Sequence, residues 1–253
     1  MDYIRRPPGL IRVSRRNLAV RYRAAAVGPK MGPMRQQWAD YWMFLREFRR
    51  TFESTGAVLP SGPALGHALA HFVREGASGS NGGGRRILEV GPGTGAVTGH
   101  IVRALRPGDE LELVERNDDF VDRLRDRLQS DEMLRPSADR ITLHHAGVEE
   151  LPEDRPFDVI VSGLPLNNFS IAFVDELLGK LGRLLAPGGT LSFFEYVAIR
   201  HMKASLSRRA ERERLRGIGQ LLDNFLREHE IRRDRVLVNL PPAWVHHVRL
   251  KSK

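Results

Sequence analysis

The 253-residue sequence contains no cysteine, which excludes disulfides and thiolate metal sites. It also lacks any run approaching the roughly 20 apolar residues of a membrane-spanning helix. The first 35 residues are rich in arginine but include one serine and no apolar h-region, so no signal peptide is predicted. No metal-ligand spacing and no Ser/His/Asp arrangement is apparent, and no metal is predicted. A reducing, cytoplasmic location is compatible with these absences.

Positive charge is plentiful, and it is unevenly placed along the chain. The formal net charge is +9. Residues 1–35 hold nine Lys/Arg against one acid, and residues 200–235 hold eleven against six. This distribution favours a polyanionic partner, either a membrane surface or nucleic acid. The alternative is that these segments are solvated faces that keep the protein soluble.

The most informative stretch is a glycine-rich loop between a predicted strand and a predicted helix. An apolar run ending at Val90 breaks into Gly91, Gly93 and Gly95, and a helix pattern resumes at Ala96. Glycines permit the sharp turn and the close approach of a ligand, and the helix directs free backbone N–H groups toward it. The loop lacks the Lys-Ser/Thr of a phosphate loop, which disfavours a nucleoside triphosphate.

An acidic residue follows at a suitable distance, because Glu115 ends the next strand-like run 20 residues after Gly95. A carboxylate there can accept both ribose hydroxyls of a nucleoside cofactor. The stretch from Glu89 to Gly95 resembles the E-x-G-x-G-x-G motif of class I methyltransferases, which use S-adenosylmethionine (SAM). The glycine spacing leaves a dinucleotide site as the less favoured alternative.

The resemblance implies a SAM site at the carboxyl ends of the strands. Many SAM enzymes have an Asp for the adenine amino group where this chain has Gly147, so that contact is expected from backbone near Val148 or from Glu149. The predicted cofactor-binding residues are Glu89, Gly91, Pro92, Gly93, Thr94, Gly95, Glu115, Arg116, Gly147, Val148, Glu149 and Ser162.

Three regions are predicted from composition and periodicity. Residues 1–33 read as a basic flexible arm. Residues 34–84 read as amphipathic helices, at 34–55 and 64–74, followed by a glycine-rich linker. Residues 85–253 read as the SAM-binding methyltransferase domain, with a basic helical insertion at 198–235.

Within this domain, strands and helices alternate, which predicts an α/β fold with a Rossmann-like, mostly parallel sheet covered by helices on both faces. A closing hairpin completes seven strands. The strands are expected near 86–90, 110–115, 140–145, 157–162, 190–197, 236–240 and 244–250, and the helices near 95–105, 117–129, 170–185 and 206–230.

The helix at 34–55 carries aromatic and apolar residues at three- and four-residue spacing, with arginines alongside. Such a helix suits the plane of a lipid interface. Packing of the stripe against the domain is the alternative. Trp38, Tyr41 and Trp42 are the predicted membrane contacts.

The segment after the fourth predicted core strand, Ser162 to Phe169, indicates the substrate. A tight Gly-Leu-Pro turn offers backbone carbonyls that can hold an amine near a methyl donor. Amino-methyltransferases that act on nucleobases have a related turn, in which an aromatic ring stacks on the extruded base. This chain has Leu166 in that slot, which favours a flexible aliphatic amine as the acceptor.

Four stretches together resemble bacterial phospholipid N-methyltransferases, which methylate phosphatidylethanolamine and whose relatives methylate ornithine lipids. They are Thr55–Ser61, Glu89–Gly95, Val161–Phe169 and Asn239–Ala243. The resemblance runs from about Trp38 to Val248. It implies methylation of an aminolipid at the inner face of the cytoplasmic membrane, with peripheral binding to anionic lipid through the amphipathic helix and the basic segments. Asn167 and the long basic segment 198–235 depart from the family pattern.

Site roles follow from this resemblance and from the expected strand ends. The backbone of Ser162, Gly163, Leu164 and Pro165 is expected to position the nitrogen, and Glu195 or Tyr196 to accept a hydrogen bond or a proton. The expected contacts to the substrate head group are Asn167, Asn168, Arg200 and His201.

Two other functions compete with lipid methylation. A relative of the rRNA adenine N6-dimethylases is supported by the basic arm, by Asn167 and by the Leu-Pro turn. It is opposed by Leu166 and by the tryptophan-containing helix. A non-catalytic membrane-binding module is the weaker alternative, because the cofactor loop is intact. The lipid hypothesis expects no nucleic-acid partner.

Overall fold

The computed structural model describes residues 21–24, 62–75, 83–196, 209–238 and 242–250. Most of the predicted arm, the predicted helix at 34–55 and the segment 197–208 lie outside these residues. Within the described part, no helix is long and apolar enough to cross a bilayer.

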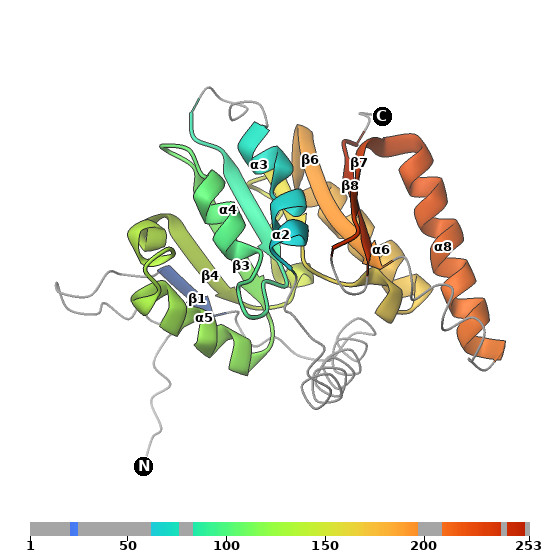
Figure 1. Cartoon of the computed structure of the whole chain (residues 1–253), viewed down its shortest axis with the longest axis horizontal. Helices are drawn as coiled ribbons and strands as arrows, with labels where there is room; N and C mark the ends of the chain where they lie inside the picture. Colours follow the sequence, from blue (N-terminus) through green and yellow to red (C-terminus); the bar gives the residue numbers. More distant parts are fainter. Residues whose placement is uncertain (1–20, 25–61, 76–82, 197–208, 239–241, 251–253) are drawn as a thin grey trace, which may run out of the picture.

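One eight-stranded sheet organises the molecule (Figure 1). The strands from β1 to β6 run parallel, and β8 and β7 add antiparallel at one end. In spatial order they are β1 (Arg21–Ala24), β4 (Ile141–His145), β3 (Glu110–Glu115), β2 (Arg86–Val90), β5 (Phe157–Ser162), β6 (Leu185–Tyr196), β8 (Ala243–Val248) and β7 (Glu230–Val236). The predicted Rossmann-like, mostly parallel α/β sheet is confirmed.

The eighth strand was not predicted, because β1 lies inside the segment expected to be a flexible arm. It pairs in parallel with β4, from Arg21 opposite Thr142 to Ala24 opposite His145. Its sequence, Arg-Tyr-Arg-Ala, carries no long apolar run. Edge strands tolerate such charged residues, which is why composition did not reveal it.

The first strand of the closing hairpin also differs from the prediction. It was expected at residues 236–240, but β7 occupies 230–236, and all but its last residue lie in the segment 198–235 expected as a helical insertion. The helix expected near 206–230 is present as α8 (Arg209–His229), and β7 begins directly after it. Strand β7 is charged because it lies at the sheet edge, where Arg233 pairs with Glu230 at 2.7 Å.

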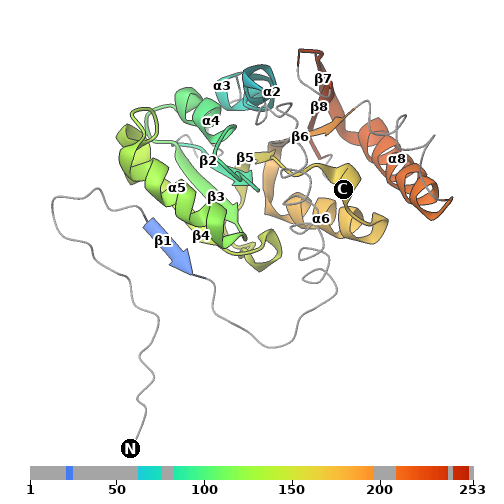
Figure 2. The same ribbon diagram turned by 60° about the horizontal axis from the view of Figure 1, so that its bottom comes forward.

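Helices cover both faces of the sheet (Figure 2). On one face lie α2 (Pro63–Leu69), α3 (His71–Glu75), α4 (Thr98–Ala104) and α5 (Asp118–Ser130), and on the other α6 (Ile171–Leu184) and α8. The predicted helix at 64–74 is interrupted at Ala70. Short 3-10 helices are η1 (Arg135–Arg140), η2 (Val148–Glu150) and η3 (Leu166–Asn168).

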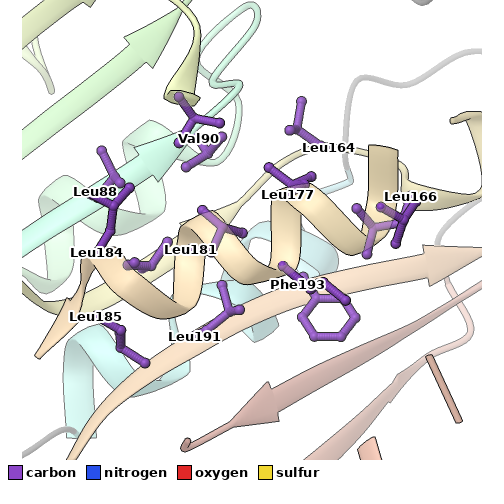
Figure 3. Close-up of a cluster of buried hydrophobic side chains, with 14 of the residues drawn as sticks. Leu88, Val90, Leu164, Leu166, Leu177, Leu181, Leu184, Leu185, Leu191 and Phe193 are labelled. Carbon is purple, nitrogen blue, oxygen red and sulfur yellow. The ribbon is translucent and has the colours of Figure 1, made fainter. Parts of the chain in front are cut away.

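Alternation along the strands divides the core into two layers. In β2, Ile87 packs toward α4 and α5, whereas Leu88 and Val90 pack toward α6. Figure 3 shows the second layer, in which Leu177 and Leu181 of α6 lie over the strands. Each such side chain, fully buried, stabilises the fold by about 1.5–3 kcal/mol. The two layers fix the strand ends, where the glycine loop begins.

Candidate functional site

The carboxyl ends of the central strands are joined by backbone hydrogen bonds into one continuous rim. The Gly91 N–H donates to the Val114 carbonyl (3.0 Å), and the Gly163 N–H donates to the Val90 carbonyl (2.8 Å). The loops after β2, β3 and β5 are therefore adjacent, as predicted for a ligand site at this edge of a parallel sheet.

Glycine is required at two contacts of this rim. Gly91 has a φ of +67°, in the left-handed region that favours glycine. A Cβ on Gly163 would lie 2.7 Å from the Gly91 carbonyl oxygen, so a side chain would force the two loops apart. The backbone of the glycine loop thus meets the backbone of the proposed substrate loop directly.

Glu115 lies at the end of β3, as predicted, and holds the surrounding backbone. Its Oε2 accepts the Gly93 N–H (3.0 Å), and its Oε1 accepts the N–H groups of Arg116 (2.8 Å) and Asn117 (2.9 Å). Burial raises the pKa of Glu115 to about 7, while these three N–H groups oppose the rise. Each carboxylate oxygen has two acceptor positions, so Oε2 has capacity for a hydroxyl as well as for Gly93.

Glu89 is the most perturbed carboxyl group of the site. Its side chain is 0% exposed, and among the described residues neither oxygen has a hydrogen-bond partner. The Thr98 hydroxyl is close by, but it forms no hydrogen bond of normal geometry. Burial raises the pKa of Glu89 to about 8, and the Glu115 carboxylate adds to the rise.

A buried carboxyl group without hydrogen-bond partners lowers the stability of the fold, unless a ligand bound at the glycine loop supplies the missing partners. A cationic ligand fits this position, because a positive charge would stabilise the ionised carboxylate. SAM carries both an ammonium and a sulfonium group. The pair Glu89 and Glu115 therefore fits the predicted cofactor.

The predicted adenine region connects the loops after β3 and β4. Arg116 forms an ion pair with Glu149 (Nη1 to Oε1, 2.8 Å). The other oxygen of Glu149 is buried and has no hydrogen-bond partner among the described residues. Val148 is buried, and the Gly147 N–H donates to Glu150 Oε1 at 2.9 Å. The structure thus brings together Arg116, Val148 and Glu149, as the sequence predicted, and leaves one carboxylate oxygen for a donor such as an amino group.

Arg127 supports the glycine loop, although the sequence analysis did not single it out. From α5, its Nη1 donates to the Thr94 carbonyl (2.7 Å), and its Nη2 pairs with Asp131 (2.7 Å). The spacing of Arg127 and Asp131 is a helical i,i+4 pair, which the sequence does show. The contact with Thr94 depends on the tertiary packing of α5 and has no sequence signal.

The loop after β5 differs from the expectation in one respect. Leu166 is 1% exposed and packs in the core with Leu164 (Figure 3), so it does not face the site. Phe169 is also buried and stacks on Phe173, with ring centroids 4.3 Å apart. Residues 162–170 accordingly present no exposed aromatic ring. The conclusion that a base lacks a stacking platform here is retained, but its cause is the burial of the apolar residues.

The polar residues of this loop divide between the core and the surface. Ser162 is buried, and its Oγ accepts the Leu164 N–H at 3.4 Å. Asn167 is only 2% exposed, which disagrees with its expected contact to a head group. Asn167 lies in η3, where Leu166 and Asn167 are the buried residues. Asn168 is half-buried and Pro165 is buried.

Glu195 and Tyr196 lie on opposite faces at the end of β6. Tyr196 packs edge-to-face on Phe194, with centroids 5.0 Å apart, and burial raises its pKa to about 12. A phenol with this pKa keeps its proton at neutral pH, which disfavours Tyr196 as a proton acceptor. Glu195 is buried, and alternation along β6 places it on the same face as Phe193, which packs in the α6 layer; it is the better candidate of the two.

The structure contains a Ser/His/Asp constellation that the sequence analysis did not recognise. His247 Nδ1 lies 2.7 Å from Ser192 Oγ, and its Nε2 lies 3.2 Å from Asp234 Oδ2. Burial lowers the pKa of His247 to about 4, although Asp234 opposes this. The ring is therefore neutral, donating to Asp234 and accepting from Ser192. Both Ser192 and His247 are 0% exposed, so the group is structural and no nucleophile is accessible.

The remaining predicted contacts cannot be placed. Trp38, Tyr41, Trp42, Arg200 and His201 lie outside the described residues.

A family model described as "Methyltransferase domain" matches residues 87–189, which include the glycine loop, Glu115 and the loop after β5. Residues 87–189 are a methyltransferase domain.

Three curated relatives are each similar to part of this chain. An ornithine lipid N-methyltransferase from Singulisphaera acidiphila is 27% identical over 159 residues, which are 60% of this chain and 76% of that protein. The C-methyltransferase UbiE of ubiquinone/menaquinone biosynthesis from Pseudomonas putida is 32% identical over 114 residues, 45% of this chain and 42% of UbiE. The ribosomal RNA small subunit methyltransferase A from Parasynechococcus marenigrum is 34% identical over 105 residues, 40% of this chain and 32% of that enzyme.

Solved structures share the fold of the methyltransferase domain. An O-methyltransferase from Bacillus cereus, in complex with SAH, superposes with a TM-score of 0.57 at 18% identity, covering 81% of this chain and 90% of that one. The O-methyltransferase TomG from Streptomyces achromogenes, in complex with SAM, gives 0.54 at 16% identity, covering 87% of this chain and 100% of TomG. At these identities the likeness shows the fold.

These findings confirm the class I methyltransferase fold. The domain match and the glycine loop with its two buried carboxyl groups make the chain a SAM-dependent methyltransferase. The predicted cofactor, S-adenosylmethionine, is also the ligand type of the two neighbouring structures. The relatives differ in the atom that they methylate, so the acceptor is a separate question.

Proposed function

We propose that this chain is a SAM-dependent N-methyltransferase that methylates the primary amine of a membrane aminolipid, phosphatidylethanolamine or an ornithine lipid. The observation that carries the proposal is the extent of the match to the ornithine lipid enzyme. That alignment spans 159 residues and 76% of the relative, whereas the alignments with the C-methylating and rRNA-methylating relatives span less than half of each enzyme.

The loop after β5 supports an alkyl amine as the acceptor. Its aromatic residue Phe169 is buried against Phe173, so a flat nucleobase finds no exposed ring among residues 162–170 on which to stack. Backbone carbonyls can hold an alkyl nitrogen without such a ring, since they accept hydrogen bonds from its N–H groups. We assign this positioning role to the carbonyls of residues 162–164.

The main chemical task is to supply the amine without its charge. When bound, SAM provides a methyl group on a cationic sulfur, and a neutral thioether leaves. A primary ammonium with a pKa near 10 must first lose a proton, which costs about 4 kcal/mol at pH 7. A nearby positive charge reduces this cost, because it lowers the pKa of the ammonium. Glu195, buried at the end of β6, is the assigned acceptor for the proton.

The predicted location is the inner face of the cytoplasmic membrane. The aromatic and arginine-bearing segment 34–55 and the basic residues around Arg200 and His201 supply the proposed contacts to anionic lipid. In this view the carboxyl ends of the central strands, where the glycine loop lies, face the lipid head groups.

One assay tests the proposal against its rivals. The protein is incubated with labelled SAM and, separately, with phosphatidylethanolamine vesicles, ornithine-lipid vesicles, a quinone-precursor acceptor and unmodified small-subunit ribosomal RNA. We expect label in a lipid amine only. A Gly91→Val variant is the matched control, because a Cβ at Gly91 would lie 2.5 Å from Leu164 and strain the glycine loop. Label in RNA or in the quinone precursor alone would refute the lipid assignment.

A further inference from the structure

Helix α8 packs against α6, and Gly217 of α8 lies against Ile171 at the beginning of α6. A Cβ on Gly217 would lie 2.3 Å from Ile171 Cδ1, so any larger residue here would require the Ile171 side chain to move. The neighbouring residues Leu215 and Ile218 are buried, and Ile218 belongs to the core layer under α6. Helix α8, the helical part of the basic segment that departs from the family pattern, is therefore packed firmly onto the domain.

Arg214 of α8 contacts the loop after β5. It lies three residues before Gly217, hence on the same side of α8. Its Nη1 donates to the Asn167 carbonyl at 3.0 Å and also to the Phe169 carbonyl. These carbonyls lie at the end of η3, where helix carbonyls lack partners along the chain and a cation is favourable.

The loop is consequently held at both ends. At its start, the Gly163 N–H is bonded to β2 through the Val90 carbonyl (2.8 Å). At its end, the guanidinium of Arg214, from helix α8, donates to the carbonyls of Asn167 and Phe169, which are two residues apart. Between these two anchors runs the segment from Leu164 to Leu166, which has buried side chains and little freedom to shift.

We propose that Arg214 is a positioning residue for the methyl acceptor: it fixes the loop after β5 so that the carbonyls of residues 162–164 align the substrate nitrogen. This rests on the proposed function for the identity of the acceptor. The glycine loop has its own supports, Glu115 and Arg127, so loss of Arg214 leaves the cofactor site in place.

The central test compares Arg214→Met with Arg216→Met in the full chain. Arg216 is an exposed arginine two residues along the same helix, so its replacement removes the same charge without touching the loop. For Arg214→Met we expect kcat/KM for the acceptor to fall by about 100-fold, since a misplacement of about 1 Å costs that much, with an unchanged Kd for SAM. Arg216→Met should behave as the wild type in both measurements.

Hydrogen exchange gives a readout that does not depend on the acceptor. The amides of Asn168 and Phe169 are bonded within η3, to Pro165 and Leu166, and should exchange faster in Arg214→Met only. Arg214→Lys, which keeps one donor near the carbonyls, should recover part of both the protection and kcat/KM, and it serves as the second variant if Arg214→Met does not fold.

The outcomes separate the two proposals. If Arg214→Met matches Arg216→Met in loop exchange and in kcat/KM, the positioning role is refuted. If the wild type methylates no aminolipid, the proposed function fails, while the exchange comparison still decides whether Arg214 holds the loop.

Discussion

Replacing Glu89 by glutamine should make the protein more stable at neutral pH while impairing its cofactor site. Glutamine has nearly the same shape as a protonated glutamate. In the folded protein, Glu89 is protonated at pH 7 because burial raises its pKa to about 8, whereas in the unfolded chain it ionises near 4.5. Folding therefore requires the uptake of a proton, and this requirement weakens stability.

The magnitude follows from these two values. A carboxyl group whose pKa is raised by folding contributes its full stability below pH 4.5, and that contribution is lost as the pH rises toward 8. Each pH unit in this window costs about 1.4 kcal/mol, so the penalty at pH 7 reaches about 3 kcal/mol. Glu89→Gln removes it. The variant should match the wild type near pH 4.5 and exceed it by about 3 kcal/mol at pH 7.

Urea unfolding at pH 5, 6, 7 and 8 measures this difference, and SAM titration measures the functional loss, which should be tenfold or more because a charge-assisted contact disappears. Glu112→Gln is the matched control on the neighbouring strand. Burial would raise the pKa of Glu112, but hydrogen bonds from His144 and Arg86 outweigh it and lower the pKa, so this variant should lose stability at pH 7. A Glu89→Gln effect that is independent of pH, or destabilising throughout, would refute the reasoning.

Three further outcomes are expected. Gly163→Ala should destabilise the fold by about 1–3 kcal/mol in thermal unfolding, because its Cβ would lie 2.7 Å from the Gly91 carbonyl oxygen. Gly83→Ala, whose Cβ would have no atom within 4 Å, should leave the stability unchanged, and equal effects of the two variants would contradict the close approach. The wild type and His247→Gln should differ less in free energy of unfolding as the pH falls, by about 3 kcal/mol between pH 6.5 and pH 4. Burial lowers the pKa of His247, so between these pH values only the unfolded wild-type chain binds a proton at this residue. A difference that stays constant in urea titrations would argue against a neutral, buried ring. Tyr196→Phe should keep kcat within about twofold in the methylation assay, because a phenol with a pKa of about 12 is no base, and a large loss would restore it as a proton acceptor.

Much of the fold could be predicted from local sequence signals. The apolar run of β2, the turn at Gly91 and the acidic end of β3 at Glu115 are each encoded within a few residues, and all three lie where the sequence placed them. Strand β1 was missed and β7 was placed too late in the chain; both are charged and lie at the edges of the sheet. Edge strands bury one face or less, so their sequences carry a weak apolar pattern.

The site was predictable only as far as contacts are local. Glu89 follows from the glycine motif and Glu115 from the end of the next strand, but the raised pKa values of both depend on burial in the folded chain. Arg127 and Arg214 each reach a carbonyl in a distant loop, at Thr94 and at Asn167, and arginines on exposed-looking helices give no hint of such partners. Leu166 was assigned by its place in a motif, whereas the packing of η3 decides which way it points.

Strand β1 has a practical consequence for shortened versions of the protein. A fragment that begins at residue 85 would keep every residue of the methyltransferase domain match, yet it would remove the neighbour of β4. The backbone N–H and C=O groups of Ile141–His145 that face β1 would then lack hydrogen-bond partners, and strands of other molecules could pair with them. Such a fragment should self-associate through these groups, even though its cofactor loop is complete.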